Sequence, residues 1–292
     1  MNDRITISVV IPAYNSSRTL GEALDSVRAQ TYQPHELIVV DDGSTPEEAE
    51  AIDRIAAGCM VLHLSTNRGP SVARNKGIAR ATGEWVAFLD SDDVWLPRKI
   101  EHQVAYLNAH PECRAVHCSV TVRGRDGGES ISVKRAVVFE DFVEFPCPVF
   151  PSAVVMHRET LLEAGLFDPT KRCCEDLDLF LRFTSEHPIA CVAEPLLVRR
   201  AGWDGLSANI PAFWREADRV YREYLRVFKD ARCARDTLIG LHSDFVLRAL
   251  YQRNFALAWR MGCRAARHDV PRFRLLPRVL TGAVRNRLRR HR

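Results

Sequence analysis

Carboxylate side chains follow one apolar run of the sequence at a spacing that suits a divalent cation. Asp90 and Asp92, separated by Ser91, come directly after residues 85–89. Two carboxylates this close are costly to leave unpaired in a dry environment. Mg²⁺ or Mn²⁺ would relieve their repulsion, since these hard cations take oxygen ligands that substrate phosphates and water complete. A metal held there can neutralise the charge that develops on a departing diphosphate.

Polar motifs also follow the apolar runs 5–11 and 37–40. Each motif alone is typical of an ordinary turn, and that alternative stays open for each. Their convergence at one sheet edge would instead favour a ligand site, in which Asp42 bonds a base or ribose and Gly43 lets the backbone approach the ligand. The motifs are Pro12, Ala13, Tyr14 and Asn15 after the first run, and Asp41, Asp42, Gly43 and Ser44 after the second.

A third polar stretch follows the apolar run 60–64 and supplies cationic side chains. Asn67 and Arg68 lead into a predicted helix over residues 70–81, which carries Arg74. Arg74 could contact a phosphate, or it could be an ordinary surface arginine on that helix. The first apolar run is not followed by G-x-G-x-x-G, and no G-K-[ST] loop occurs, which argues against a dinucleotide oxidoreductase and a P-loop NTPase.

The elements that must position these residues alternate between strand and helix. The four apolar runs predict strands, and helical spacing of apolar residues predicts helices over 17–30, 46–57, 70–81 and 97–108. Such alternation predicts an α/β fold with a mostly parallel sheet flanked by helices. Ligands of these sheets bind beyond the carboxyl ends of the strands, where the polar motifs fall.

Beyond residue 114 the pattern is looser. Pro195 interrupts a predicted strand over residues 189–198, so we expect that strand near a sheet edge. From about residue 211 the sequence predicts helices, and apolar side chains over 244–263 either pack on the preceding domain or meet a lipid-linked acceptor. Further strands are predicted at 114–122 and 152–157, and helices at 159–164 and 175–184.

Composition restricts the class of protein further. The 292 residues are 46% hydrophobic and 27% charged, which is typical of a globular chain. No apolar stretch reaches the roughly 18–20 residues that span a bilayer, and the N-terminus lacks a signal peptide, so a cytoplasmic location is expected. The nine scattered cysteines are expected to be reduced thiols rather than a redox pair or zinc ligands.

Positive charge is concentrated at the C-terminus. Of a net charge of +4, residues 264–292 hold ten arginines and one aspartate, about +9, which leaves about −5 for the remainder. This segment predicts an anionic partner, either a membrane surface or nucleic acid; a solvated terminus without a partner is the alternative. Its mixture of basic and apolar residues favours peripheral association with the inner face of a membrane. Interleaved aromatic residues are lacking, so no nucleic acid partner is expected.

Together these motifs resemble those of family 2 glycosyltransferases. The matching stretches are 9–15, 38–44, 67–75, 88–93 and 165–168, with the pair Glu175 and Asp176. The resemblance implies the GT-A nucleotide-diphospho-sugar transferase fold as a catalytic domain over residues 1–210. Its nucleotide-binding half would be 5–113 and its acceptor half 114–210, followed by a helical, basic C-terminal extension over 211–292.

The resemblance also implies roles for individual residues. Asp90 and Asp92 would form the D-x-D metal site, with Asp92 the first choice as ligand of Mn²⁺ or Mg²⁺, and Asp176 would be the catalytic base. The expected nucleotide-binding residues are Pro12, Ala13, Tyr14, Asn15, Asp42, Gly43, Ser44, Asn67, Arg74, Asp90 and Ser91.

Asp176 carries a physical tension. The resemblance implies inversion at the anomeric carbon, which requires a base on the acceptor side of the sugar and a metal on the leaving-group side. A carboxylate at a helix N-terminus is stabilised as the anion, which makes it a weaker base. A helix-capping aspartate is therefore the alternative. Glu175 could hold the acceptor or stay exposed, and Asp178 is expected to face solvent.

Two departures from the family matter. Many relatives carry a histidine in the loop after the last strand, whereas residues 199–207 contain none, and Arg200 could contact phosphate in its place. The Q-x-x-R-W motif and the transmembrane helices of processive synthases are also absent, so we expect transfer of one sugar per encounter.

The resulting prediction is an inverting, metal-dependent glycosyltransferase. It would move one sugar from a nucleotide-diphospho-sugar, with a UDP-sugar expected, to a hydroxyl of a glycan or lipid-linked acceptor in cell-surface polysaccharide or glycolipid synthesis. A non-catalytic nucleotide-sugar-binding protein is the alternative. The complete set of Asp42, Asp90, Asp92 and Asp176 argues against it.

Overall fold

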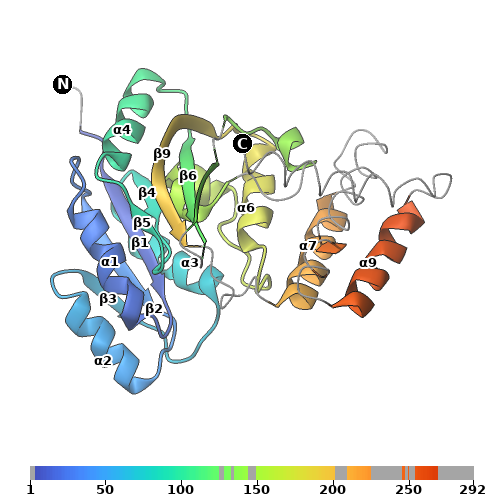
Figure 1. Ribbon diagram of the computed structural model, residues 1–292. Helices are drawn as coiled ribbons and strands as arrows, with labels where there is room; N and C mark the ends of the chain where they lie inside the picture. Colours follow the sequence, from blue (N-terminus) through green and yellow to red (C-terminus); the bar gives the residue numbers. More distant parts are fainter. Residues whose placement is uncertain are drawn as a thin grey trace. The chain divides into compact units, whose positions relative to one another are not determined.

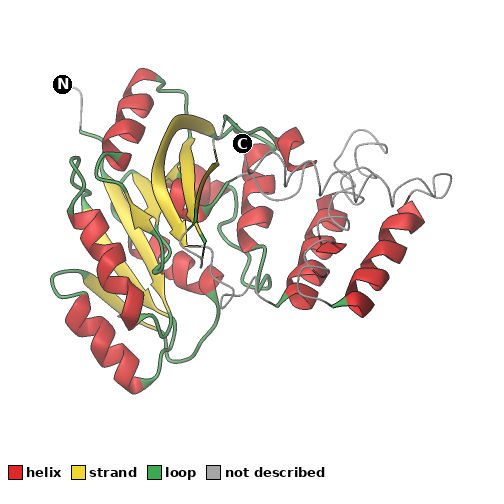
Figure 2. Cartoon of the chain, in the orientation of Figure 1, coloured by secondary structure: helices red, strands yellow, loops and turns green. Residues whose placement is uncertain are grey.

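Strands and helices alternate along the first part of the chain in the computed structural model, as the apolar periodicity predicts (Figures 1 and 2). The structure describes residues 4–124, 128–132, 135–143, 149–200, 209–224, 245–246, 249 and 254–268. Its first elements are β1 (Ile7–Ala13), α1 (Ser17–Arg28), β2 (Glu36–Asp41), α2 (Pro46–Ile55), β3 (Met60–His63), α3 (Pro70–Arg80), β4 (Trp85–Phe88), β5 (Val94–Trp95) and α4 (Lys99–Ala109).

The later elements follow the looser pattern of the sequence, although the strand predicted over 152–157 begins only at Val155, after a 3₁₀ turn. The 3₁₀ turns and the short strands β5 and β7 were not predicted, and these strands span only 2 and 4 residues and show no alternation long enough to recognise. The later elements are β6 (Ala115–Arg123), β7 (Glu129–Ser132), the 3₁₀ turns η1 (Phe139–Val143) and η2 (Pro151–Ala153), β8 (Val155–His157), α5 (Arg158–Glu163), α6 (Glu175–Thr184), β9 (Ala190–Arg200), α7 (Ile210–Tyr224) and α9 (Phe255–His268).

The strands of the described residues form one nine-stranded sheet in the order β3-β2-β1-β4-β8-β6-β9-β5, with β7 paired to β6. β3, β2, β1 and β4 pair in parallel, whereas β8 is antiparallel to both β4 and β6. β6 and β9 therefore run in the direction of the first four strands, and the sheet is mostly parallel. The predicted α/β fold is confirmed, and the ends of β2, β1 and β4 lie side by side at one edge.

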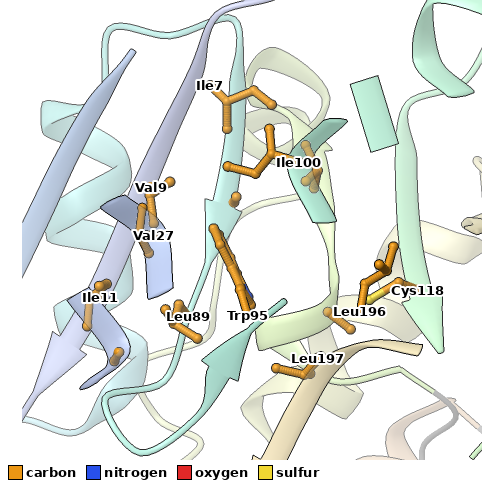
Figure 3. Packing of buried hydrophobic residues seen from close by; sticks show 14 of the residues in the cluster. Ile7, Val9, Ile11, Val27, Leu89, Trp95, Ile100, Cys118, Leu196 and Leu197 are labelled. Carbon is orange, nitrogen blue, oxygen red and sulfur yellow. The ribbon is translucent and has the colours of Figure 1, made fainter. Parts of the chain in front are cut away.

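Alternate residues of β1 pack on opposite faces of this sheet. Ile7, Val9 and Ile11 belong to a buried core that includes side chains of α1, α2 and α4 (Figure 3). Val10 faces α3, where a Cβ atom on Gly77 would lie 2.3 Å from Val10 Cγ1. Glycine at this position lets α3 approach the sheet closely, and this contact places the helix that carries Arg74.

The prediction that the strand interrupted by Pro195 lies near a sheet edge is confirmed. β9 is next to the terminal strand β5, which pairs only with Leu197 and Val198 of β9. Pro195 lies opposite Ser119, where the register between β6 and β9 shifts. A bulge beside an edge tolerates a residue without an N–H donor.

The chain divides into two compact units, residues 1–139 with 149–202 and residues 140–148 with 203–292. In the second unit α7 buries Trp214, Val220 and Tyr221. Within the described residues, no helix combines the length and apolar character needed to cross a bilayer. The loop 201–207 and most of the arginine-rich segment lie outside the described residues.

Candidate active site

Arg74 of α3 links two elements that carry predicted site residues. The residue is only 4% exposed, and its guanidinium donates from Nη2 to Asp90 Oδ1 at 2.7 Å and from Nη1 to Glu175 Oε1 at 2.8 Å. Burial of a guanidinium is costly unless hydrogen-bonded carboxylates compensate its charge. This ion triad therefore holds the end of β4 against the start of α6. The alternative that Arg74 is an ordinary surface arginine is wrong. Each terminal nitrogen of its guanidinium already bonds a carboxylate, so contact with a phosphate would share these nitrogens.

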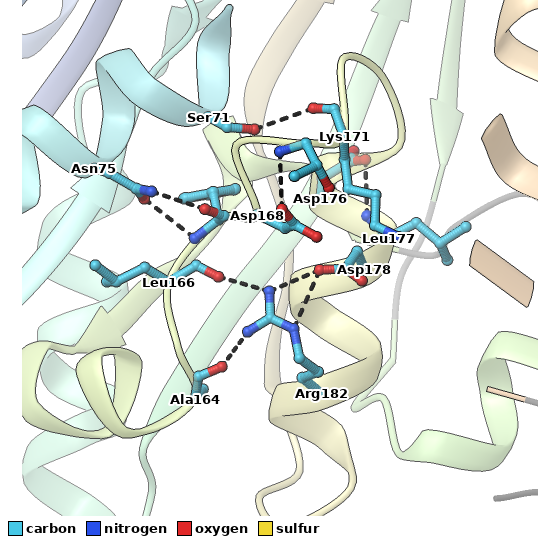
Figure 4. Close-up of polar contacts among 12 residues, drawn as sticks. Ser71, Asn75, Ala164, Leu166, Asp168, Lys171, Asp176, Leu177, Asp178 and Arg182 are labelled. Carbon is cyan, nitrogen blue, oxygen red and sulfur yellow. Dashed lines mark hydrogen bonds and ion pairs between the residues drawn. The ribbon is translucent and has the colours of Figure 1, made fainter. Parts of the chain in front are cut away.

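Two further side chains of α3 hold the segment that leads into α6 (Figure 4). Asn75 exchanges two hydrogen bonds with the backbone of Phe167, at 2.7 and 3.1 Å. Ser71 donates to the carbonyl of Lys171 at 3.3 Å. Residues 71, 74 and 75 share one face of α3 because they are three and four positions apart. Sequence analysis missed this anchoring role, although polar side chains at helical spacing on a buried helix were a usable signal.

The turn before α6 is fixed by Arg182, which corrects the prediction for Asp178 (Figure 4). Arg182 donates to the carbonyls of Ala164 and Leu166 and to Asp178 Oδ2, the last at 2.7 Å. Asp178 is 3% exposed rather than solvent-facing. The guanidinium of Arg182, one helical turn along α6, compensates the charge of Asp178 and so allows this carboxylate to be buried.

Asp176 lies at the start of α6, half-buried, with the charges of Arg74, Asp90 and Arg199 around it. The helix begins after Cys174, so Asp176 is not its N-cap. Burial raises the pKa of Asp176, and this outweighs the lowering by the backbone N–H of Leu177 and by Arg74. The carboxylate is thus a stronger base than a helix terminus alone would give, which relieves the tension noted from the sequence.

Glu175 has a different environment from Asp176. It is 8% exposed and bonds Arg74. Burial and the neighbouring Asp176 charge raise the pKa of Glu175 to about 7, against the opposing effect of Arg74. Its carboxylate is therefore directed toward Arg74. A role in holding the acceptor, one of the alternatives from the sequence, is not favoured by this geometry.

The acidic turn after β4 presents one carboxylate and buries another. Asp92 is exposed, yet partial desolvation and the Asp90 charge raise its pKa. Asp93 is 3% exposed, and burial followed by the charges of Asp90 and Asp92 raises its pKa to about 8. Sequence analysis did not assign a role to Asp93.

This turn fits a divalent cation that shares its ligands with a substrate. Within the described residues no three His, Cys, Asp or Glu side chains form a complete protein cage. Mg²⁺ and Mn²⁺ sites of nucleotide enzymes need only one or two carboxylates, because phosphates and water complete the shell. Asp92 is exposed and repelled by Asp90, so it suits such a ligand, whereas Asp90 Oδ1 already accepts from Arg74.

The ends of β1 and β2 are joined by short polar contacts. The backbone N–H of Asn15 donates to Ser44 Oγ at 2.9 Å, and Asn15 Oδ1 accepts from the N–H of Thr45 at 3.0 Å. Beside them, Tyr14 is 49% exposed. Pro12 and Ala13 pair with Val40 and Asp41, so both lie within the sheet. The predicted nucleotide-binding residues of these two strands thus lie together.

Asp42 holds the loop that opens α3. Its carboxylate accepts from the backbone N–H groups of Arg68 at 2.8 Å and Gly69 at 2.7 Å, beside the exposed Asn67. Each oxygen keeps a second lone pair for a ligand. Gly43 has a φ of +70°, and a Cβ there would lie 2.4 Å from the Thr66 carbonyl carbon. The positive φ and this close approach to the loop's backbone both require glycine, and an approach of the ligand to Gly43 stays a prediction.

Arg200 has a carboxylate partner of its own, its contact with phosphate stays a prediction, and the sequence analysis overlooked its neighbour Arg199. The guanidinium of Arg200 pairs with Glu22 of α1, while its backbone N–H donates to Asp93 at 3.3 Å. Arg199 acts on the charges of Asp92, Asp93 and Asp176. Arg200 also acts on the charge of Asp92, so both arginines lie near the acidic turn.

The architecture of the site defines a class of protein. The parallel half of the sheet carries carboxylates at its strand ends, and the mixed half adds the pair Glu175 and Asp176. This arrangement is the GT-A sugar-transferase fold. Residues 8–157, just over half of the chain, match the family model "Glycosyl transferase family 2". The chain belongs to this family.

Relatives and solved structures agree with this assignment. An uncharacterized glycosyltransferase of Rickettsia felis is 32% identical over 65% of this chain, which spans 32% of that protein. The amylovoran biosynthesis glycosyltransferase AmsE of Erwinia amylovora is 30% identical over 68% of this chain and 77% of its own length.

Two solved structures share the fold. S. aureus TarS 1–349 in complex with UDP-GlcNAc has a TM-score of 0.63 at 16% identity, covering 92% of this chain and 93% of that one. The Pyrobaculum calidifontis mannosyltransferase PcManGT in complex with GDP-Man and Mn²⁺ has a TM-score of 0.61 at 22% identity, covering 97% of this chain and 81% of that one.

Removal of the Arg74 guanidinium is expected to destabilise the protein strongly. Arg74→Met leaves Asp90 and Glu175 without their cation, and breaking a buried ion pair in this way costs about 3–5 kcal/mol of unfolding free energy. Adding Glu175→Gln removes one of the two uncompensated carboxylate charges, so it should restore part of the lost unfolding free energy. Urea unfolding measures both effects. Arg80→Met, on the exposed side of α3, is the control. Equal stability of Arg74→Met and Arg80→Met would contradict the role of the triad.

His63 gives the protein a pH-dependent contribution to stability. Its ring nitrogens lie 2.9 Å from Asp41 Oδ2 and 3.0 Å from Asp53 Oδ1. The bond to Asp41 is the main cause that raises the pKa of His63. Since the folded state favours the charged ring, the contribution is complete below the unfolded pKa of about 6.5 and is lost as the pH rises through the higher folded value.

The melting temperature of His63→Gln relative to the natural protein tests this sign. The deficit of the variant should be largest near pH 5.5 and shrink toward pH 8.5. Asp53→Asn removes one partner and should reduce the pH dependence without abolishing it. A deficit that stays constant across this range would exclude the charged imidazole as its source.

Proposed function

We propose that this chain is an inverting, metal-dependent glycosyltransferase that moves one sugar per encounter from a nucleotide-diphospho-sugar to a hydroxyl acceptor. One observation carries the proposal: Arg74 joins Asp90 of the metal-binding turn to Glu175, the neighbour of Asp176. The proposed catalytic domain is 1–210, with a nucleotide-binding half at 5–113 and an acceptor half at 114–210. Residues 211–292 form a C-terminal extension.

The donor side of the site comprises the ends of β1, β2 and β4. Tyr14 and Asn15, with Asp42 and Ser44, would surround the nucleoside, and Asp92 with Asp90 would hold Mn²⁺ or Mg²⁺. When bound, the metal would supply charge neutralisation to the leaving diphosphate. TarS with UDP-GlcNAc and PcManGT with GDP-Man and Mn²⁺ support a nucleotide-sugar donor and a divalent ion. A UDP-sugar is the proposed donor.

Asp176 acts on the acceptor side. The acceptor oxygen forms a bond to the anomeric carbon while the bond from that carbon to the diphosphate oxygen breaks, and the electron pair leaves with the diphosphate. The hydroxyl proton passes to the Asp176 carboxylate, whose pKa is raised by burial. Glu175 acts through Arg74 and keeps the turn to α6 in place. Attack from the face opposite the leaving group inverts the anomeric configuration.

The pathway and acceptor are proposed from the relatives. AmsE is named for amylovoran biosynthesis, which supports a role in cell-surface polysaccharide or glycolipid synthesis with a glycan or lipid-linked acceptor. A non-catalytic nucleotide-sugar-binding protein remains the competing function, and turnover distinguishes the two.

Donor binding and turnover test the proposal together. A thermal-shift screen of UDP-, GDP- and dTDP-sugars with and without Mn²⁺ should reveal one stabilising class, since a ligand at 100 times its Kd adds about 2.7 kcal/mol. Asp176→Asn should keep donor binding but lower turnover about 100- to 10,000-fold, whereas Asp92→Asn should lose the effect of Mn²⁺ on donor binding. NMR of the product reports its anomeric configuration.

Asp168→Asn is the matched control for the catalytic base. Its carboxylate accepts from the N–H of Thr170 at 2.8 Å on the same segment, so we expect turnover to stay close to that of the natural protein. Donor binding without turnover in the natural protein would support the non-catalytic alternative instead, and retention of the configuration would exclude inversion.

We also propose that an anionic membrane surface, the inner face of a membrane, is a partner of the C-terminal extension. Helix α9 exposes Phe255 and Trp259, by 68% and 75%, at a spacing of one helical turn. Aromatic side chains of this kind favour the membrane interface. The arginines of residues 264–292 follow directly, and each basic residue near anionic lipid adds about 1 kcal/mol of attraction.

Flotation with vesicles checks this partner. The full chain should bind phosphatidylglycerol vesicles at low salt, bind phosphatidylcholine vesicles weakly, and dissociate at high salt. Phe255→Ser with Trp259→Ser should weaken binding. Ile131→Ser is the control, because Ile131 is 62% exposed but lies in the first unit. Equal binding to both lipids, or an equal effect of the control, would end the proposal.

A further inference from the structure

Ser152 contacts both ends of the acidic turn without belonging to it. The residue lies in η2 and is fully buried. Its Oγ accepts from the backbone N–H of Asp90 at 3.0 Å, and hydrogen bonding by its hydroxyl favours the charged form of the Asp93 carboxylate, which lowers the pKa of Asp93 against the effect of burial. A hydroxyl has one hydrogen and two lone pairs. One serine can therefore satisfy the donor at the start of the turn and the acceptor at its end.

The position of Ser152 is itself fixed from two sides. The indole Nε1 of Trp95 donates to the Ser152 carbonyl at 2.7 Å, and the amide of Gln103 donates to the carbonyl of Ala153 at 2.9 Å. Trp95 and Gln103 are both buried. The hydroxyl thus projects from a backbone segment that has little freedom to move.

The acidic turn is also tied at its other contacts. The backbone N–H of Asp93 donates to the carbonyl of Asp90 at 3.0 Å, and the Asp93 carboxylate accepts from the N–H of Arg200 at 3.3 Å. Asp90 is held by Arg74 as well. Between these fixed ends only Ser91 and Asp92 project, and Asp92 is the exposed residue.

We propose that Ser152 is a positioning residue for the metal-binding turn, which it holds in the shape that presents Asp92 to a divalent cation. Ser152 acts through Asp90 and Asp93 rather than by contact with the donor. Groups that hold metal ligands in place typically change metal affinity about 10- to 100-fold when they are removed. The inference rests on the proposed metal site at Asp92.

The test compares two buried serines that both stabilise the same region. Ser152→Ala and Ser152→Cys remove the hydroxyl, and cysteine keeps the shape with only a weak donor. Ser26→Ala is the matched control, since Ser26 Oγ accepts from the N–H of Trp95 at 3.2 Å but does not bond the acidic turn. Ser152→Thr keeps the hydroxyl. Each variant is titrated with Mn²⁺ in the presence of UDP by electron paramagnetic resonance, and its melting temperature is measured.

We expect Mn²⁺ affinity to fall about tenfold or more in Ser152→Ala and Ser152→Cys, and to be retained in Ser152→Thr. Ser26→Ala should lower the melting temperature without changing Mn²⁺ affinity. If the natural protein binds Mn²⁺ with UDP and Ser152→Ala and Ser152→Cys bind it equally well, Ser152 is merely structural. The inference then fails, while the proposed metal site stands. If the natural protein does not bind Mn²⁺ with UDP, the proposed metal site fails and the inference fails with it.

Discussion

A guanidinium stays charged when it is buried, so its burial is tolerated only where carboxylates compensate the charge, and Arg74 bonds one carboxylate in each half of the first unit. Asp90 follows β4 and Glu175 opens α6. Because this compensation works only at hydrogen-bonding distance, the end of β4 and the start of α6 cannot shift independently. The acidic turn after β4 and Asp176 therefore keep a fixed separation. The in-line displacement that we propose needs such a separation, because small misplacements of reacting groups are costly in rate.

Local periodicity accounts for the part of the structure that the sequence predicts well. The apolar runs that became β1, β2 and β4 are buried on both faces, and parallel strands send their carboxyl ends to one edge. Adjacency of the polar motifs follows from these two facts. Helix α6 begins and ends at the predicted residues, because an acidic first turn and an apolar face mark it clearly.

What the sequence could not reveal depends on partners that lie far along the chain. Asp178 resembles a solvent-exposed residue until Arg182 folds over it, and Ser152 has no motif of its own although its hydroxyl meets the turn 62 residues earlier. In each case the deciding contact is tertiary, and no local pattern encodes it.

The division of the chain has a consequence for how such enzymes can be recombined. Residues 140–148 group with the second unit, although the chain on both sides of them belongs to the first unit. The polypeptide therefore passes between the units three times, after residues 139, 148 and 202. Exchange of the second unit with that of a relative would need a nine-residue graft within the first unit as well as a splice near residue 202, so a chimera joined at one point would carry a mismatched segment.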